Sequence, residues 1–227
     1  MFRPYELFDG LRYTLTKRRT HFISFISFTS MLGIALGVTA LITVLSVMNG
    51  FEHELRERIL GMASHASITT YGGQLKDWEE LSRQLDGHER LVATAPYVRG
   101  ESMLSNGKRV SGALLRGVLP GLEGGVSDVV DHIKGGQLDL LREGEYGIIL
   151  GSELAVALGA GTGDAITVVS PHVSVGPTGI MPRLRRFTVV GIFEVGMYEY
   201  DRGVALVHIR DAAKLFRLGD NVTGLRL

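Results

Sequence analysis

The sequence predicts one N-terminal transmembrane helix followed by an α+β domain with mixed or antiparallel sheets. Residues 22–48 form an unbroken stretch of 27 residues without Asp, Glu, Lys, Arg or His. As a helix it would rise about 40 Å at about 1.5 Å per residue, which exceeds the ~30 Å hydrocarbon core of a bilayer. The rest of the chain alternates short strand-like runs with turn residues and a few short helical patterns, which is typical of an α+β domain.

The composition narrows the possible functions. The chain has 227 residues, with 24 basic and 24 acidic side chains and a net charge of zero, so no overall field points to nucleic acid. There is no cysteine, which excludes disulfides, thiolate zinc sites and a cysteine nucleophile. The 30 glycines fit a region rich in turns and strands.

No pattern of catalytic residues is present. The sequence lacks the P-loop, the H-E-x-x-H zinc motif and the G-x-S-x-G nucleophile elbow. The seven histidines are scattered, and the glycine-rich run at 159–163 follows a predicted helix, so we interpret it as a helix end and a turn. We therefore expect no enzymatic activity, no metal and no cofactor in this chain, which argues against a membrane-anchored enzyme.

The charges that flank the apolar stretch predict its orientation. Residues 1–21 carry five basic and two acidic side chains, whereas residues 52–58 mix both signs. The positive-inside rule then places the N-terminus in the cytoplasm. We expect residues 1–21 to form a cytoplasmic amphipathic lead-in helix and residues 22–48 the transmembrane helix. Residues 49–227 would form a domain that is periplasmic if the membrane is a bacterial inner membrane.

The transmembrane stretch carries features of a helix that packs against others. Gly33 and Gly37 form a G-x-x-x-G pair, and several Ser and Thr residues surround it. Small and hydroxyl residues let helices approach closely within a membrane. Apolar residues continue at helical spacing beyond Met48, so we expect one rigid helix to run on and end near Gly61.

The following domain is predicted as strands separated by short helices. The dipeptide Asn106-Gly107 predicts a two-residue hairpin between two of the strands. The chain stops within a strand-like run, so we expect the domain to be incomplete at its C-terminus. The predicted strands are 66–71, 92–104, 109–119, 146–150, 165–170, 185–195, 203–208 and 222–227, and the predicted helices are 75–85, 152–158 and 209–218.

The segment between residues 170 and 185 differs from the other connections. Three of the six prolines of the chain, Pro171, Pro177 and Pro182, lie within 12 residues, and Ile180 and Met181 add apolar surface. Proline restricts the backbone and reduces the entropy that a free loop loses on binding. We therefore expect a long, stiff loop with an apolar tip that docks a partner.

The assembled motifs resemble those of the LolC/LolE family of lipoprotein-releasing ABC transporter permeases. The block GIALGV at 33–38 and the block VLSVMNGF at 44–51 carry most of the resemblance, supported by the lead-in at 7–13 and by ILG at 149–151. Further support comes from P-x-G-x-x-P at 177–182 followed by two arginines. The resemblance covers essentially the whole chain.

This resemblance implies a larger assembly. Two permeases, this one with a LolE-like partner or with a second copy of itself, would pair with a dimer of a LolD-like subunit that binds ATP and Mg²⁺. The complex would extract triacylated lipoproteins from the inner membrane and pass them to a LolA-like periplasmic chaperone. The domain outside the membrane would resemble the periplasmic domain of MacB.

The resemblance also implies site residues. The lipid cavity would be lined by Val44, Val47, Met48 and Phe51, and Gly33 and Gly37 would pack against other helices. The chaperone-binding hook would comprise Pro177, Thr178, Gly179, Ile180, Met181, Pro182 and Arg185. Two alternatives remain open at this point: a MacB-like efflux permease and an FtsX-like division permease.

Overall fold

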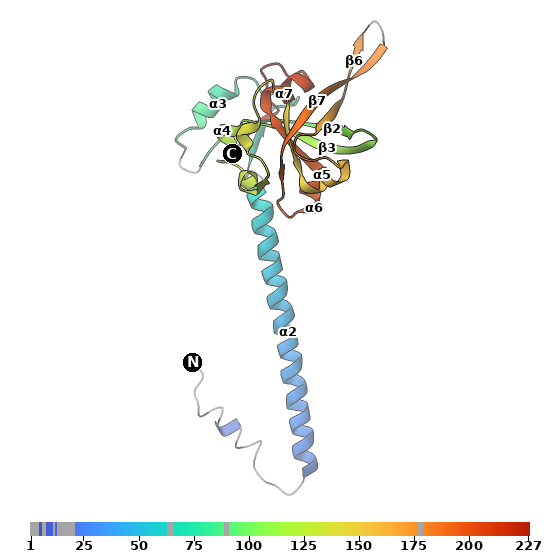
Figure 1. Ribbon diagram of the computed structural model, residues 1–227. Helices are drawn as coiled ribbons and strands as arrows, with labels where there is room; N and C mark the ends of the chain where they lie inside the picture. The colour runs from blue at the N-terminus through green and yellow to red at the C-terminus, as the bar shows by residue number, and fades with distance from the viewer. Residues whose placement is uncertain are drawn as a thin grey trace. The chain divides into compact units, whose positions relative to one another are not determined.

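The computed structural model describes residues 21–62, 66–88, 91–176 and 179–227, together with Tyr5, residues 8–10 and Arg12 (Figure 1). The chain divides into two compact units, residues 1–57 and residues 58–227. Most of the predicted lead-in helix lies outside the described residues. The positions that are described there are helical.

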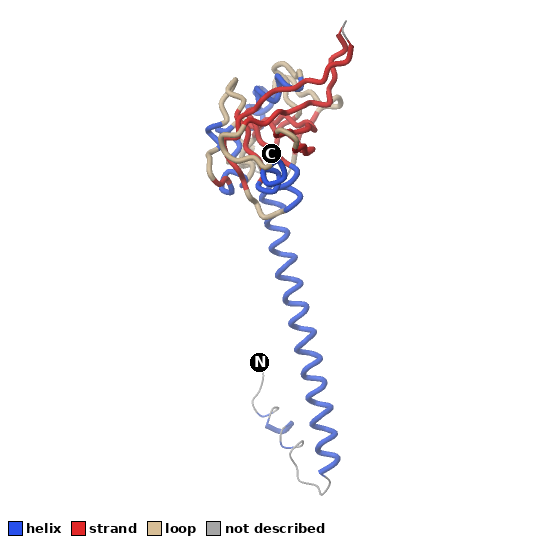
Figure 2. The backbone as a smooth tube through the Cα atoms, turned by 45° about the vertical axis from the view of Figure 1, so that its right-hand side comes forward, coloured by secondary structure: helices blue, strands red, loops and turns tan. Residues whose placement is uncertain are grey.

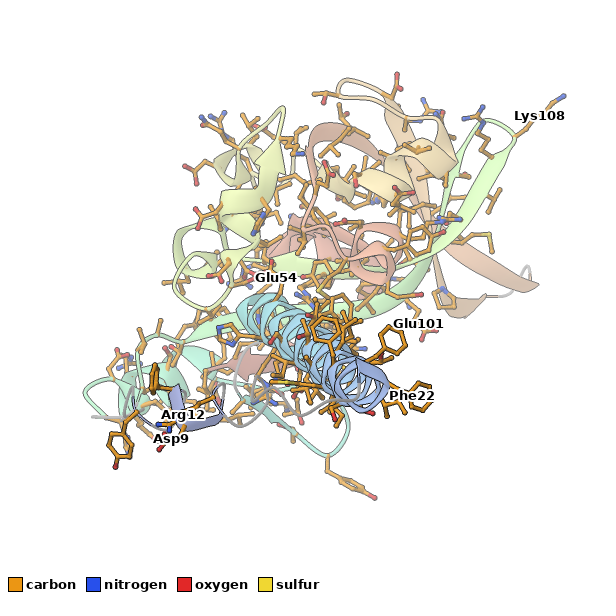
Figure 3. All side chains as sticks on the ribbon, turned by 90° about the horizontal axis from the view of Figure 1, so that it is seen from below. Asp9, Arg12, Phe22, Glu54, Glu101 and Lys108 are labelled. Carbon is orange, nitrogen blue, oxygen red and sulfur yellow. The ribbon has the colours of Figure 1, made fainter. Side chains whose placement is uncertain are left out.

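The first unit is dominated by one helix, α2, which runs from His21 to Met62, so that its last five residues belong to the second unit. Its segment Phe25–Glu54 is long and apolar enough to cross a membrane. Phe22 and Glu54 lie toward its two ends, and side chains radiate from all sides of it (Figure 3). The helix continues without interruption past Met48, which confirms the predicted extension toward Gly61.

The threonine hydroxyls of α2 are satisfied within the helix. Thr29, Thr39 and Thr43 each donate to the carbonyl four residues earlier, at 2.9, 2.8 and 2.8 Å. A hydroxyl bonded to its own backbone needs no partner on another helix. The three threonines therefore give less support to helix packing than the sequence suggested.

The second unit is built on a ring of six hydrogen-bonded strands. In order around the ring these are β2 (Ala95–Asn106), β3 (Arg109–Val118), β8 (Val204–His208), β5 (Gly147–Gly151), β7 (Gly179–Phe193) and β6 (Ala165–Gly176). Strand β6 pairs back onto β2 and closes the ring. The β3–β8 and β5–β7 pairs are parallel and the others antiparallel, so the sheet is mixed as predicted.

Three short strands extend this ring. Strand β9 (Gly224–Arg226) pairs with the first residues of β2, and β1 (Ser67–Thr69) pairs with β9. Strand β4 (Ile133–Lys134) adds to the far edge of β7. The predicted strands at 66–71 and 222–227 therefore shrink to three paired residues each.

The central strands are buried on both faces. On β8, Ala205 and Val207 pack into one hydrophobic cluster, and Val204 and Leu206 pack into another. Successive strand residues point to opposite faces. A continuous apolar run such as VALVH at 204–208 is therefore what a strand between two cores requires.

Short helices cover the ring. The structure contains α3 (Trp78–Leu85), α4 (Pro120–Glu123), α5 (Ser152–Leu158), α6 (Tyr198–Gly203) and α7 (Ile209–Phe216), with 3₁₀ turns at Asp128–His132 and Leu138–Leu140. Helix α5 begins and ends at the predicted residues, while α4, α6 and the 3₁₀ turns were not predicted. These elements are too short for a helical period to be recognised.

The β2–β3 turn lies one residue later than predicted. Asn106 pairs with Arg109, so Gly107 and Lys108 are the two turn residues, and Lys108 extends from the tip (Figure 3). Gly107 has φ of 60°, which suits glycine at the first central position of a hairpin turn. The Asn106 side chain instead donates to the carbonyls of Leu158 and Gly159, at 3.3 and 3.2 Å, and so caps α5.

We expect the domain to lose stability in mild acid through His208. Burial lowers the pKa of His208 from its ordinary value of 6.5, and its Nδ1 accepts a hydrogen bond from the Arg210 amide at the start of α7. The unfolded chain binds the proton more readily, so the stabilisation is complete above about pH 6.5 and is lost as the pH falls below it. Urea unfolding at pH 7.5 and pH 5.5 measures this loss. A His208→Asn variant, which keeps an acceptor without the titration, should show a smaller difference between the two pH values, and an equal difference would contradict the assignment.

Candidate docking hairpin and membrane helix

The segment predicted as a long loop is a β-hairpin. Strand β6 reaches Gly176 and β7 starts at Gly179, with Gly176 paired to Gly179. The prediction of an irregular connection over 171–184 is therefore wrong. Each strand of a two-stranded ribbon has an unpaired edge, and a proline can stand there without losing a ladder hydrogen bond.

Four of the seven predicted hook residues occupy the outer end of this hairpin. Gly179, Ile180, Met181 and Pro182 are the first four residues of β7, whereas Pro177 and Thr178 lie outside the described residues. The outer parts of β6 and β7 project beyond the rest of the domain (Figure 2). The structure thus separates a projecting ribbon from a base that belongs to the ring.

Arg185 belongs to the base and not to the tip. It pairs with Val168 on β6, and its guanidinium lies 5.5 Å from the ring centroid of Tyr146. The Tyr146 ring meets the buried Phe187 edge to face at a centroid distance of 5.4 Å. Arg185 is therefore held against the domain, several residues away from the other predicted hook residues.

The predicted cavity residues and the predicted packing glycines share one face of α2. At about 100° per residue, Val44, Val47, Met48 and Phe51 fall within a sector of about 100° that also contains Gly33 and Gly37. The four side chains are 62%, 67%, 64% and 64% exposed, so the neighbouring described residues of α2 do not cover them. Between Gly33 and Phe51 this face changes from small residues to large ones.

The sequence analysis missed a groove on the outer surface of the ring. It has a volume of about 830 Å³ and lies over β2, β3 and the end of the ring part of β6. Met103, Val110, Leu114, Val169 and Pro171 contribute apolar surface, with Arg99 and Glu101 also lining it. Every second residue of β2 and β3 points outward, so the alternation of large side chains at 103, 110 and 114 was the available signal.

Two buried carboxylates of the domain, those of Asp201 and Asp211, have structural roles. Asp201 accepts hydrogen bonds from the amides of Val195 and Gly196 at 2.9 and 3.0 Å, and Asp211 accepts from those of Gly144 and Tyr146 at 2.9 and 3.2 Å. Within the described residues there is no group of three His, Cys, Asp or Glu side chains that could hold a metal ion. These carboxylates fix loops and are committed to backbone groups.

The fold and sequence define the family of the chain. Residues 27–225 match the family model of the MacB-like periplasmic core domain, and the chain belongs to this family. This confirms the predicted α+β class and the MacB-like domain.

Curated relatives identify the branch that the chain resembles. The lipoprotein-releasing system transmembrane protein LolC of Xylella fastidiosa strain 9a5c is 47% identical over the whole chain and 54% of its own length. LolC of Neisseria meningitidis serogroup B is 46% identical over 98% of this chain and 54% of its own length. LolE of Haemophilus influenzae is 29% identical over 97% of this chain and 54% of its own length. The resemblance to the LolC/LolE permeases is confirmed, and the chain spans about half the length of these relatives.

Proposed function

We propose that this chain is part of the permease subunit of an ABC transporter that extracts lipoproteins from the inner membrane and passes them to a LolA-like periplasmic chaperone. The observation that carries the proposal is the 47% identity to a LolC protein across the whole chain, which includes both α2 and the β6–β7 hairpin. The domain family alone is also compatible with a MacB-like efflux permease or an FtsX-like division permease. Identity at this level over an alignment that covers both the hairpin and α2 favours lipoprotein release.

The apolar helix supports the proposed membrane arrangement. Residues 1–21 would lie on the cytoplasmic side, residues 22–48 would cross the inner membrane, and residues 49–227 would form the periplasmic part. The basic excess before the helix supports this orientation. Because α2 is continuous from His21 to Met62, a displacement within the membrane would be carried several turns beyond residue 48.

The change from small to large residues along this face of α2 supports a lipid-binding role. A neighbouring helix can approach closely at Gly33 and Gly37, and the larger Val44, Val47, Met48 and Phe51 would hold it away nearer the periplasm. The space so opened is apolar, and each acyl CH₂ buried in it contributes about 0.8 kcal/mol. We propose that the acyl chains of a triacylated lipoprotein occupy this space.

The remaining components would lie on other chains. A dimer of LolD-like subunits would bind ATP and Mg²⁺ and hydrolyse the nucleotide, so that this chain itself carries no cofactor and performs no catalysis. The second permease would be a LolE-like protein or another copy of this one. Closure driven by ATP would narrow the space beside α2 and expel the lipid.

Replacing Met48 or Phe51 by Asp should abolish lipoprotein release, because a carboxylate on the lipid-facing surface opposes acyl binding. The matched control is Asn49→Asp, which places the same charge at the same depth on the opposite face of α2. Release from spheroplasts by purified chaperone, with the membrane level of each variant checked by immunoblot, measures the effect. Unchanged release by the Met48 and Phe51 variants would contradict the cavity role.

The hairpin assignment is tested by photo-crosslinking in the full-length protein in its native membrane. We expect probes at Thr178 and Met181 to capture the LolA-like chaperone, and Pro177→Ala or Pro182→Ala to weaken the capture. A probe at Lys108, on the tip of the other projecting hairpin, is the control and should capture none. An adaptor or a murein hydrolase in place of the chaperone would move the assignment to the efflux or division alternative.

A further inference from the structure

The β6–β7 hairpin contains a two-residue irregularity in its register. From Ala165↔Thr188 to Ser170↔Arg183 the two strands pair continuously, and they pair again from Val173↔Pro182 to Gly176↔Gly179. Pro171 and His172 have no counterpart on β7, where Pro182 and Arg183 are adjacent. Strand β6 therefore carries a bulge of two residues.

The bulge lies where the hairpin leaves the ring. Strand β6 pairs with β2 only through Thr167, Val168 and Val169, and beyond the bulge it pairs with β7 alone. Pro171 has no N–H, so it cannot donate a ladder hydrogen bond to either neighbour. Within four residues, β6 loses its β2 partner, contains a proline and shifts its register against β7.

The inner side of the bulge is firmly held. Ser170 is completely buried, and the guanidinium of its partner Arg183 donates to the carbonyl of Leu215 at 3.4 Å. Arg185 and Phe187, next along β7, pack with Tyr146. These contacts hold the base against the domain, so the bulge at residues 171 and 172 is the first position along β6 at which the direction of the ribbon can change.

We propose that Pro171 and His172 form an orienting bulge that sets the direction of the hairpin tip and so controls docking of the chaperone. This inference rests on the proposed function, because it concerns the same docking site. Bulges bend and twist the strand that carries them. The four residues beyond the bulge span about 13 Å at about 3.3 Å each, so a change of about 30° in direction moves the tip by about 7 Å.

The decisive variant deletes Pro171 and His172 together. Because side chains alternate with a period of two, removal of two residues keeps every other side chain on its own face and leaves the tip sequence intact. The matched control replaces both residues by glycine, which keeps the bulge but removes the side chains. A second variant inserts Gly-Ser between Pro182 and Arg183, so that β7 gains two residues opposite Pro171 and His172. This variant takes the place of the deletion if the deletion variant does not fold.

Two measurements report separately on the direction of the hairpin and on its docking to the chaperone. Because the sequence lacks cysteine, spin labels can be attached to introduced cysteines at Lys108 and Ile180, and their separation reports the direction of the ribbon. A photo-crosslinking probe at Met181 reports docking in the full-length protein in its native membrane. The thermal midpoint of each variant shows whether the domain remains folded.

We expect the deletion to shift the distance between the labels by several ångströms and to reduce chaperone capture at least about tenfold, a loss of about 1.4 kcal/mol. The glycine control should keep both values. An unchanged label distance, or a shifted distance with undiminished capture, would overturn the orienting role. If the unmodified protein captures no chaperone, the proposed function fails and the control of docking fails with it, while the label distance still decides whether the bulge orients the ribbon.

Discussion

Gly151→Ala is expected to destabilise the domain strongly. A Cβ at residue 151 would lie 2.1 Å from the carbonyl oxygen of Asp201 and 2.7 Å from its carbonyl carbon. These are backbone atoms, so no side-chain rotation relieves the contact. Overpacking in a core typically costs about 1–3 kcal/mol, and a clash with fixed backbone should reach at least the upper end of this range.

The surroundings of Asp201 explain why its backbone cannot yield. The Asp201 side chain is 3% exposed and holds the amides of Val195 and Gly196, which follow strand β7. Moving residue 201 away from a Cβ would break these bonds and leave a carboxylate buried without partners. The close approach of β5 and α6 therefore depends on the absence of a side chain at Gly151.

Urea unfolding of the chain in detergent, followed by the fluorescence of its single tryptophan, Trp78, measures this effect. Gly161→Ala is the control, because a Cβ at residue 161 would have no atom of the described residues within 4 Å and the φ of Gly161 is not in the left-handed region. We expect the control to keep the midpoint of the unmodified chain. A Gly151→Ala variant that unfolds at the same urea concentration as the control would contradict the clash.

The same glycine illustrates what the sequence could predict. The motif ILG at 149–151 was recognised as part of the family resemblance, and β5 was predicted within one residue. The reason for the glycine was hidden, since Asp201 lies fifty positions away on α6, a helix too short to be recognised. Local patterns thus predicted the elements, and the contact between distant elements required the structure.

The candidate site shows the same difference between what local patterns predict and what depends on contacts between distant elements. Helix α2 and the shared face of its site residues follow from helical spacing, which is a local property. The prolines of 171–184 indicated a loop because they weaken a strand, but the ribbon leaves free edges that accept them. The two-residue bulge depends on how β6 and β7 pair, so no local pattern could reveal it.

The buried ion pair between Arg226 and Glu123 should be the other position where a single substitution has a severe effect. Glu123 on α4 is fully buried, Arg226 on β9 is 5% exposed, and Arg226 Nη2 contacts Glu123 Oε2. The guanidinium also lies 5.8 Å from the ring centroid of Tyr97. Removing one partner leaves a charge in the core, which costs about 3–5 kcal/mol.

We expect Glu123→Ala and Arg226→Ala each to lower the free energy of unfolding by about that amount, measured by urea unfolding near neutral pH. Glu145→Ala is the control, since its pair with Arg142 spans 3.8 Å and both side chains are more than half exposed. An exposed pair of this kind contributes about 0–1 kcal/mol. Equal losses in the buried and the exposed pair would show that the buried charges do not stabilise the fold.

A double substitution separates the contribution of the ion pair to the free energy of unfolding from the cost of leaving one charge buried without its partner. Glu123→Leu combined with Arg226→Met replaces both charges by apolar side chains of similar size, and such replacements are often neutral or stabilising. The environment favours this outcome, because Glu123 Oε1 and two of the three guanidinium nitrogens, Arg226 Nε and Nη1, have no hydrogen-bond partner among the described residues. We therefore expect the double variant to be more stable than either single one. If it is less stable than both, the two substitutions destabilise the domain independently, and the cost of an orphaned buried charge is not what destabilises the single variants.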